Sequence, residues 1–198
     1  MSEAVPLTLA MTGASGAPYA VRLLRELNRA AVPVRLIVSD TGWRLLAEEM
    51  DITDETGLRD ATGDWSRVVA YSDRDRGATP ASGSAPTRGM VICPCSMGTL
   101  ASIAQGTTRS LIERAADVVL KERRPLVVVP RETPYSAIHL ENMLRLTRAG
   151  AVVLPASPGF YHRPATIDDL IAFVVGRVLA QLGMRTDVGP RWASGEAE

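Results

Sequence analysis

The chain has 198 residues, and its 22 Lys and Arg balance its 22 Asp and Glu, so no overall field favours nucleic acid or an anionic membrane surface. Hydrophobic residues make up 46% of the chain, but no apolar run approaches the roughly 20 residues that cross a bilayer. These values exclude a membrane-spanning protein and predict one soluble globular domain with a small-molecule partner. The N-terminus lacks the pattern of a signal peptide, so we expect a cytoplasmic protein.

Strand-like apolar runs alternate with helix-like patterns, which predicts a mainly parallel sheet with helices on both faces. The expected strands span residues 7–11, 34–38, 90–94, 126–130 and a run in the 150s, with a weak candidate at 67–71. The expected helices span residues 18–29, 41–50, 97–104, 111–121, 136–147 and 167–182.

Two regions lack this regularity. Residues 51–78 are rich in Asp, Thr, Gly and Arg, and we expect helix, short strand and surface loop there, without assigned chemistry. After Gly183 the periodicity ends. We therefore assign residues 1–185 to a single domain and expect the tail, residues 186–198, to leave that domain or to pack on a neighbouring subunit.

The first expected strand ends in the loop TGASGAP, which opens a helix. Backbone N–H groups at Gly13 and Ala14, the positive helix end and the hydroxyl of Ser15 together predict a phosphate cradle. The loop lacks the full G-x-G-x-x-G spacing and a Walker lysine, which weakens dinucleotide and triphosphate interpretations. A tight turn that needs glycine for backbone reasons alone is the alternative.

The second expected strand ends at Ser39 and Asp40. A dinucleotide-binding dehydrogenase would place an acid near this point to bind ribose hydroxyls, so Asp40 keeps that alternative open. Both residues can equally cap the helix that follows, which is their more common use.

Two loops of small polar residues bracket the strand expected at 90–94. After it, PCSMGT places Ser96, Gly98 and Thr99 at a helix N-terminus and predicts an anion or flavin site, with capping as the alternative for Ser96. Before it, the run PASGS, which contains Ser82, suits close approach of backbone to a ligand. A flexible loop is the alternative there.

The strand expected at 126–130 delivers Arg131 and Glu132 side by side. Ligands of open parallel sheets bind beyond the carboxyl ends of the strands, so this pair suggests an anion clamp beside a proton carrier. A solvent-exposed ion pair is the alternative.

The last loop, SPGFYHRP, and the helix after it hold two further candidates. Tyr161 offers an O–H donor and an aromatic face, which suits a substrate with one apolar and one charged end, but an ordinary packed tyrosine fits as well. Arg177 interrupts an apolar helix, either as a surface cation or as a buried phosphate partner.

Cysteine and histidine do not predict a metal centre. Cys93 and Cys95 are separated only by Pro94 and have no second pair of ligands, so we interpret them as buried free thiols. His139 and His162 are too few and too far from other ligand types.

Taken together, these loops resemble the UbiX-type flavin prenyltransferase family, within the wider flavoprotein decarboxylase-like superfamily. The matching stretches are TGASGAPYAVRLL, the strand ending at Ser39, PASGSAPTRGMVICPCSMGTLA, LIERAADVVLKERRPLVVVPRETPYSAIHLENM and GAVVLPASPGFYHRPATIDDL. They cover nearly the whole chain except residues 51–78 and the tail. The resemblance implies an α/β fold, a Rossmann-like flavodoxin-type three-layer sandwich.

The resemblance also implies an activity. Such enzymes join the dimethylallyl group of dimethylallyl phosphate to N5 and C6 of reduced FMN and supply prenylated FMN to a partner decarboxylase. It further implies a homo-oligomer, by resemblance a dodecamer. No acidic pair of the kind that holds a diphosphate through a metal occurs among the loops, so we expect a metal-independent reaction with a monophosphate donor.

Site residues follow from the matching motifs. The resemblance assigns proton handling to Glu132 with Ser82 as its partner. The positions implied to hold FMN are Gly13, Ala14, Ser15, Ser39, Ser96, Met97, Gly98, Thr99 and Arg131. The positions implied to hold dimethylallyl phosphate are Tyr161, Arg177, Lys121 and Arg114, some of them reaching across a subunit boundary.

One departure and two rival functions remain. Some family members carry Trp a few residues before PASGS, where this chain has Arg76, which leaves the prenyl-chain preference and the rate open. An FMN-dependent peptidyl-cysteine decarboxylase would use a His in the first part of the chain, but no His precedes His139. A non-catalytic FMN-binding carrier module would not require Glu132, Ser82 and Tyr161.

Overall fold

The computed structural model describes residues 4–184 and 187–189, and these form a six-stranded sheet in which every paired strand runs parallel. The order across the sheet is β3-β2-β1-β4-β5-β6. The strands are β1 (Leu7–Met11), β2 (Val34–Val38), β3 (Val68–Ser72), β4 (Met90–Cys95), β5 (Leu126–Pro130) and β6 (Val152–Val153). The chain thus starts in the middle of the sheet, builds outward to β3, and returns to build the other half from β4.

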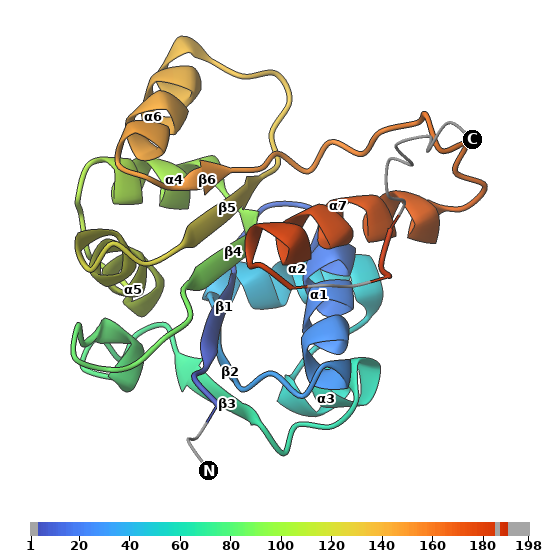
Figure 1. Cartoon of the computed structure of the whole chain (residues 1–198), viewed down its shortest axis with the longest axis horizontal. Coiled ribbons are helices and arrows are strands. Elements are labelled where there is room, and N and C mark those ends of the chain that lie inside the picture. Colours follow the sequence, from blue (N-terminus) through green and yellow to red (C-terminus); the bar gives the residue numbers. More distant parts are fainter. Residues whose placement is uncertain (1–3, 185–186, 190–198) are drawn as a thin grey trace, which may run out of the picture.

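Helices cover both faces of the sheet. On one side lie α1, α2, α3 and α7, and on the other lie α4, α5 and α6 (Figure 1). Their bounds are α1 (Ala17–Arg29), α2 (Asp40–Met50), α3 (Glu55–Thr62), α4 (Met97–Ala104), α5 (Leu111–Lys121), α6 (Ala137–Arg148) and α7 (Ile167–Gln181), and a short 3₁₀ helix, η1 (Thr79–Ala81), precedes β4. This is the predicted three-layer sandwich.

The continuous apolar strands follow from burial on both faces. All five residues of β1 are buried. Leu7, Leu9 and Met11 pack into the core on the α1 side, whereas Ala10 packs into the core on the α4 and α5 side. Alternate residues of a strand point to opposite faces, so a strand with helices on both sides needs apolar residues throughout.

The strand order reverses direction between β1 and β4. The chain leaves β1 for α1 on one face and leaves β4 for α4 on the other face. The two connections therefore diverge at the carboxyl ends of neighbouring strands, and such a divergence is where open parallel sheets bind ligands.

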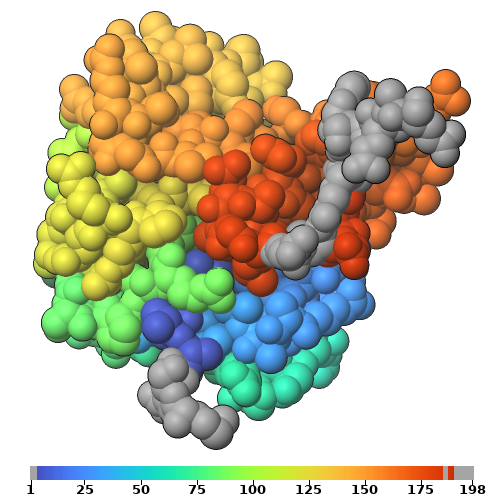
Figure 2. All heavy atoms as spheres, in the orientation of Figure 1, coloured from blue at the N-terminus to red at the C-terminus, as the bar shows by residue number. Residues whose placement is uncertain are grey.

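The sequence placed most elements within one or two residues of their observed bounds. Residues 51–78 contain α3 and β3, as expected, and the strand in the 150s is only two residues long. The segment between β6 and α7 extends away from the body of the protein (Figures 1 and 2). None of the described helices combines the length and the apolar character needed to cross a membrane.

The beginning of the predicted tail folds back on its own domain. Residues 187–189 lie against α7 of the same chain, because a Cβ added at Gly176 would collide with the carbonyl of Val188. Residues 185–186 and 190–198, the rest of the predicted tail, lie outside the described residues.

Candidate functional site

Thr12 ties the loop after β1 to the end of β4. Its Oγ1 donates to the carbonyl of Pro94 at 3.0 Å and accepts from the N–H of Ser96 at 2.8 Å. Its backbone N–H also donates to the carbonyl of Pro94, at 3.2 Å. Since Thr12 is buried, these bonds satisfy polar groups that water cannot reach, and they hold the β1 and β4 loops together where the strand order reverses.

The loop after β1 also lies against the start of α2. A Cβ added at Gly13 would be 2.5 Å from both Cβ and Oγ1 of Thr41, so no larger residue fits without a backbone shift. A Cβ added at Gly42 would likewise lie 2.7 Å from the carbonyl oxygen of Met11. The predicted TGAS cradle and the loop at Ser39 therefore form one continuous wall.

Ser39 and Ser96 both cap helices, as the alternative interpretation of each had it. The Ser39 hydroxyl accepts from the N–H of Gly42 at 3.0 Å, and the Ser96 hydroxyl accepts from the N–H of Thr99 at 3.2 Å. Each also has a second hydroxyl within reach, that of Thr41 at 3.2 Å and that of Thr99 at 3.0 Å. Capping leaves hydroxyl capacity for a ligand, because each Ser and Thr oxygen has a donor and two lone pairs.

Glu49 is a site residue that the sequence reasoning missed. From the last turn of α2, its carboxylate accepts from the N–H of Gly16 at 2.9 and 3.2 Å and from the N–H of Ala17 at 2.7 Å. Glu49 therefore occupies the N–H groups of Gly16 and Ala17 at the α1 N-terminus, and the cradle at Gly13, Ala14 and Ser15 stays a prediction. A carboxylate is stable there for the same reason that a phosphate would be, since the helix N-terminus attracts anions. The only sign of this contact in the sequence is that Glu49 lies on the expected helix 41–50, which follows the strand ending at Ser39.

The β5 loop reaches the β1 loop through Arg131. Its Nε donates to the carbonyl of Ser15 at 3.2 Å. The adjacent Glu132 is half-buried, and its Oε1 accepts from the N–H of Thr133 at 3.0 Å. Arg131 and Glu132 do not form an ion pair with each other among the described residues. The geometry therefore does not support the alternative of a surface ion pair.

Gly98 gives the α4 N-terminus an open surface. The nearest atom that a Cβ there would meet is the Ser96 hydroxyl, at 4.0 Å. Met97 is buried beneath it in the core on the α4 and α5 side. The predicted FMN-holding residues thus meet at the carboxyl end of the sheet, from the loops after β1, β2, β4 and β5.

Ser82 lies at the other end of the sheet. It follows η1 in the loop that leads into β4, and its hydroxyl is 3.0 Å from that of Ser84. Arg124 holds this loop through bonds to the carbonyls of Gly83 at 3.0 Å and Ala85 at 2.9 Å. Parallel strands all begin at one end of the sheet and finish at the other. Ser82 precedes β4 and Glu132 follows β5, so a single chain does not bring the two residues together.

Two cations of the predicted donor site lie on α5. Lys121 neighbours the PASGS loop, since a Cβ at Gly83 would be 2.8 Å from its Nζ, and it pairs with Glu122 at 2.5 Å. Arg114 pairs with Asp117 at 2.9 Å. Surface ion pairs of this kind are weak, so both cations remain available to a phosphate.

Tyr161 and Arg177 form a third group. The Tyr161 ring packs edge-on against Phe173 with ring centroids 5.9 Å apart, and Arg177 lies one helical turn beyond Phe173 on α7. Phe173 and Arg177 both line a surface hollow of about 300 Å³ beside β6. Arg177 is exposed, as in the surface-cation alternative.

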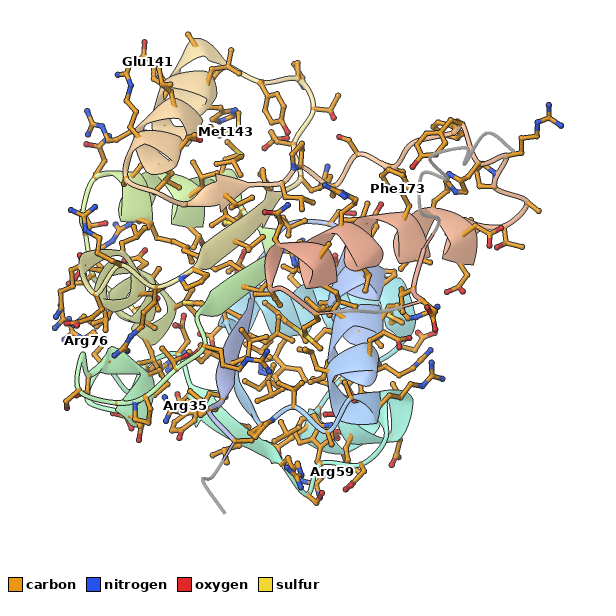
Figure 3. All side chains as sticks on the ribbon, in the orientation of Figure 1. Arg35, Arg59, Arg76, Glu141, Met143 and Phe173 are labelled. Carbon is orange, nitrogen blue, oxygen red and sulfur yellow. The ribbon has the colours of Figure 1, made fainter. Side chains whose placement is uncertain are left out.

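Arg76 lies on the segment between β3 and η1, on the α5 side of the molecule (Figure 3). It is exposed, and its guanidinium makes no hydrogen bond or ion pair with any described residue. Arg76 therefore lies on the same connection between β3 and β4 that carries Ser82.

The cysteines are the buried free thiols that the sequence predicted. Burial raises the pKa of Cys93 to about 12, and it also raises the pKa of Cys95, helped by the nearby Cys93. Neither thiol is a nucleophile at neutral pH. Among the described residues no group of three or more His, Cys, Asp or Glu side chains could hold a metal ion.

Comparison with known proteins relates this arrangement to an enzyme family. A sequence profile of the family described as Flavoprotein matches residues 1–179. The chain is 49% identical to the flavin prenyltransferase UbiX of Pseudomonas aeruginosa over 205 aligned residues, which cover 97% of this chain and 96% of that protein. The chain belongs to the UbiX flavin prenyltransferase family.

Two solved UbiX-type structures agree with the fold. One is AnUbiX (PadA1) in complex with FMN and dimethylallyl pyrophosphate, with a TM-score of 0.88, 41% identity, and 95% of this chain and 97% of that chain covered. The other is described as a dodecameric FMN-dependent UbiX-like decarboxylase from Escherichia coli O157:H7, with a TM-score of 0.88, 42% identity, and coverage of 95% and 99%. The UbiX assignment therefore extends over almost the whole chain, including the three groups of predicted site residues.

Proposed function

We propose that the protein is a flavin prenyltransferase, which joins the dimethylallyl group of dimethylallyl phosphate to N5 and C6 of reduced FMN. The observation that carries this conclusion is the nearly full-length likeness to UbiX at 49% identity. It is supported by the meeting of four strand-end loops, with Arg131 and Glu132 among them, at the point where the strand order reverses.

The residues at this end of the sheet fit FMN. Hydroxyls of Ser15, Ser39, Ser96 and Thr99 offer donors for a phosphate and a ribityl chain, and Arg131 offers a positive charge. The open space over Gly98 suits a planar ring close to the backbone. Glu49 already neutralises the α1 N-terminus, so we assign the ligand's phosphate to the hydroxyls and the guanidinium rather than to that helix end.

Reduced FMN supplies the nucleophilic atoms, and the protein has two tasks. Arg177, Lys121 and Tyr161 would stabilise charge that develops on the departing phosphate, and each well-aimed donor of this kind lowers a barrier by about 3 kcal/mol. Glu132 would accept and return the protons displaced as the new bonds form, which commonly accelerates a reaction by about 10²–10⁴-fold.

Mass spectrometry tests this function directly. Anaerobic incubation of the protein with reduced FMN and dimethylallyl phosphate should yield a flavin heavier by one five-carbon isoprenyl unit. Protein shown to bind both ligands that returns only unmodified FMN would contradict the assignment and favour a carrier module. A partner decarboxylase that requires prenylated FMN would receive the product.

We further propose that more than one copy of the chain completes each site. Glu132 lies at the carboxyl end of the sheet, whereas Ser82 and Lys121 lie at its other end, so neighbouring copies would have to supply one to the other. The dodecameric structure of a 42% identical relative supports this arrangement.

Complementation between variants tests the shared site. Glu132→Gln and Lys121→Ala should each be nearly inactive alone, but co-assembly should restore part of the activity, since some sites then receive an intact Glu132 and an intact Lys121. Light scattering would establish that both variants and the mixture assemble alike. A mixture no more active than its components would show that each copy forms its own site.

A further inference from the structure

The turn that carries Tyr161 is built around three aromatic rings. His162 stacks on Phe173 with ring centroids 5.5 Å apart and an interplanar angle of 9°, and Tyr161 meets both rings edge-on, at 5.6 Å from His162 and 5.9 Å from Phe173. Gly159 makes this possible, because a Cβ there would lie 3.2 Å from the Phe173 and Tyr161 rings. Phe173 lies on the side of α7 that faces this loop (Figure 3). The segment between β6 and α7 extends from the body of the protein, yet Tyr161 and His162 on it both pack against Phe173 of α7.

The His162 imidazole takes part in this cluster only through its ring. Both ring nitrogens are buried, and no described residue forms a hydrogen bond with either of them. Buried polar atoms are nearly always paired, so a ring in this position is an exception that calls for a reason. Stacking on Phe173 and edge contact with Tyr161 are its ring contacts, and the Asp169 carboxylate lies near enough to interact with it electrostatically.

Phe173 links Tyr161 to Arg177. Phe173 and Arg177 are four residues apart on α7, which places them on one face of the helix, and both line the hollow beside β6. The ring stack therefore fixes the Tyr161 side chain relative to the helix that holds the Arg177 guanidinium. The stack is thus one of the contacts that restrict the Tyr161 side chain on this projecting loop.

We propose that His162 is a positioning residue for the donor phosphate, acting as a flat ring that holds Tyr161 against Phe173 in fixed relation to Arg177. The inference rests on the proposed function, in which Tyr161 and Arg177 bind dimethylallyl phosphate. His162 itself is not placed to hydrogen-bond to the substrate, because its ring nitrogens are enclosed. It acts through the hydroxyl of Tyr161.

Steady-state kinetics with dimethylallyl phosphate test the proposal. His162→Ala should raise the KM for the donor about ten-fold, which is the usual effect of losing a hydrogen bond to a charged group, with a smaller change in kcat. His162→Phe keeps the stacked ring without the nitrogens and should restore the KM to within about two-fold of the unmodified protein. FMN affinity and assembly size, measured for each variant, should not change.

A double-mutant cycle separates positioning from a general structural role. In a Tyr161→Phe background the hydroxyl is already absent, so His162→Ala should add little to the KM. Equal ten-fold effects in both backgrounds, or a His162→Phe variant as impaired as His162→Ala, would overturn the proposal. Failure of the unmodified protein to prenylate FMN would instead contradict the proposed function, so the two results are distinguishable.

Discussion

The Oγ1 atom of Thr12 and the backbone N–H of Ser96 lie 2.8 Å apart, and this hydrogen bond joins the loops after β1 and β4. The same hydroxyl donates to the Pro94 carbonyl, so one buried side chain satisfies a donor and an acceptor from the other strand end. The loops after β1 and β4, which both contribute to the predicted flavin site, are therefore fixed to each other before any ligand binds.

Thr12→Val should weaken both stability and FMN binding. The substitution keeps the shape but leaves the partly buried Ser96 N–H without its partner, at a cost of about 1–3 kcal/mol in the free energy of unfolding. Urea denaturation and FMN titration measure the two effects. Thr12→Ser, which retains the hydroxyl, is the matched control, and equal stability of Thr12→Val and the unmodified protein would contradict the prediction.

Glu49→Gln should lower the free energy of unfolding by about 1 kcal/mol. The change removes the negative charge that faces the α1 N-terminus and one of the acceptors for the Gly16 and Ala17 N–H groups. Glu48→Gln is the control, because Glu48 lies on the same helix in an exposed pair with Arg44. A loss no greater than that of the control would show that the Glu49 cap contributes little.

Two glycine substitutions separate folding from flavin binding. Gly13→Ala would place its Cβ 2.5 Å from Thr41 and should destabilise the protein by roughly 1–3 kcal/mol. Gly98→Ala meets no atom closer than 4.0 Å and lies within α4, so it should leave the unfolding midpoint unchanged or slightly raised while weakening FMN binding. If Gly98→Ala binds FMN normally, the flavin ring does not lie against this residue.

Glu132→Gln should bind FMN normally and turn over about 10²–10⁴-fold more slowly, because the amide cannot exchange protons. Quenched-flow or endpoint mass spectrometry measures the product. Glu141→Gln, the same change on the exposed outer side of α6, provides the control (Figure 3). Normal turnover in Glu132→Gln would remove Glu132 from the mechanism.

The two thiols should be inert in the folded protein. Burial raises the pKa of Cys93 to about 12 and that of Cys95 in the same direction, so at pH 8 a thiol reagent should label native protein far more slowly than urea-unfolded protein. The unfolded thiols lose their protons above about pH 8.5, whereas the folded ones keep theirs. The contribution of the protonated thiols to the free energy of unfolding is thus fully present below about pH 8.5 and decreases as the pH rises toward 12. Rapid labelling of native protein, or an unfolding midpoint that does not change in this range, would contradict the assignment.

The sequence predicted what local patterns can encode. The Leu126–Val129 run predicts a strand buried on both faces, and Ser39 and Ser96 are recognisable helix caps, so the sheet and the loops at its carboxyl end could be anticipated. Glu49 could not be, since its contact with Gly16 joins residues 33 apart and depends on how α1 and α2 pack.

The separation of Ser82 from Glu132 follows from the predicted parallel sheet, but the family resemblance pairs the two residues without regard to that sheet. The loop before β4 and the loop after β5 lie at opposite ends of the sheet because β4 and β5 run parallel.

This separation of the two ends has a consequence for the newly made chain. Under the proposed sharing of sites, a folded but unassembled copy would hold the flavin-facing end of a site without the Lys121 that a neighbour brings to the departing phosphate. It would store FMN without reacting. The timing of the chemistry would then be set by assembly, and the protein would acquire its activity only when its concentration allows neighbours to meet.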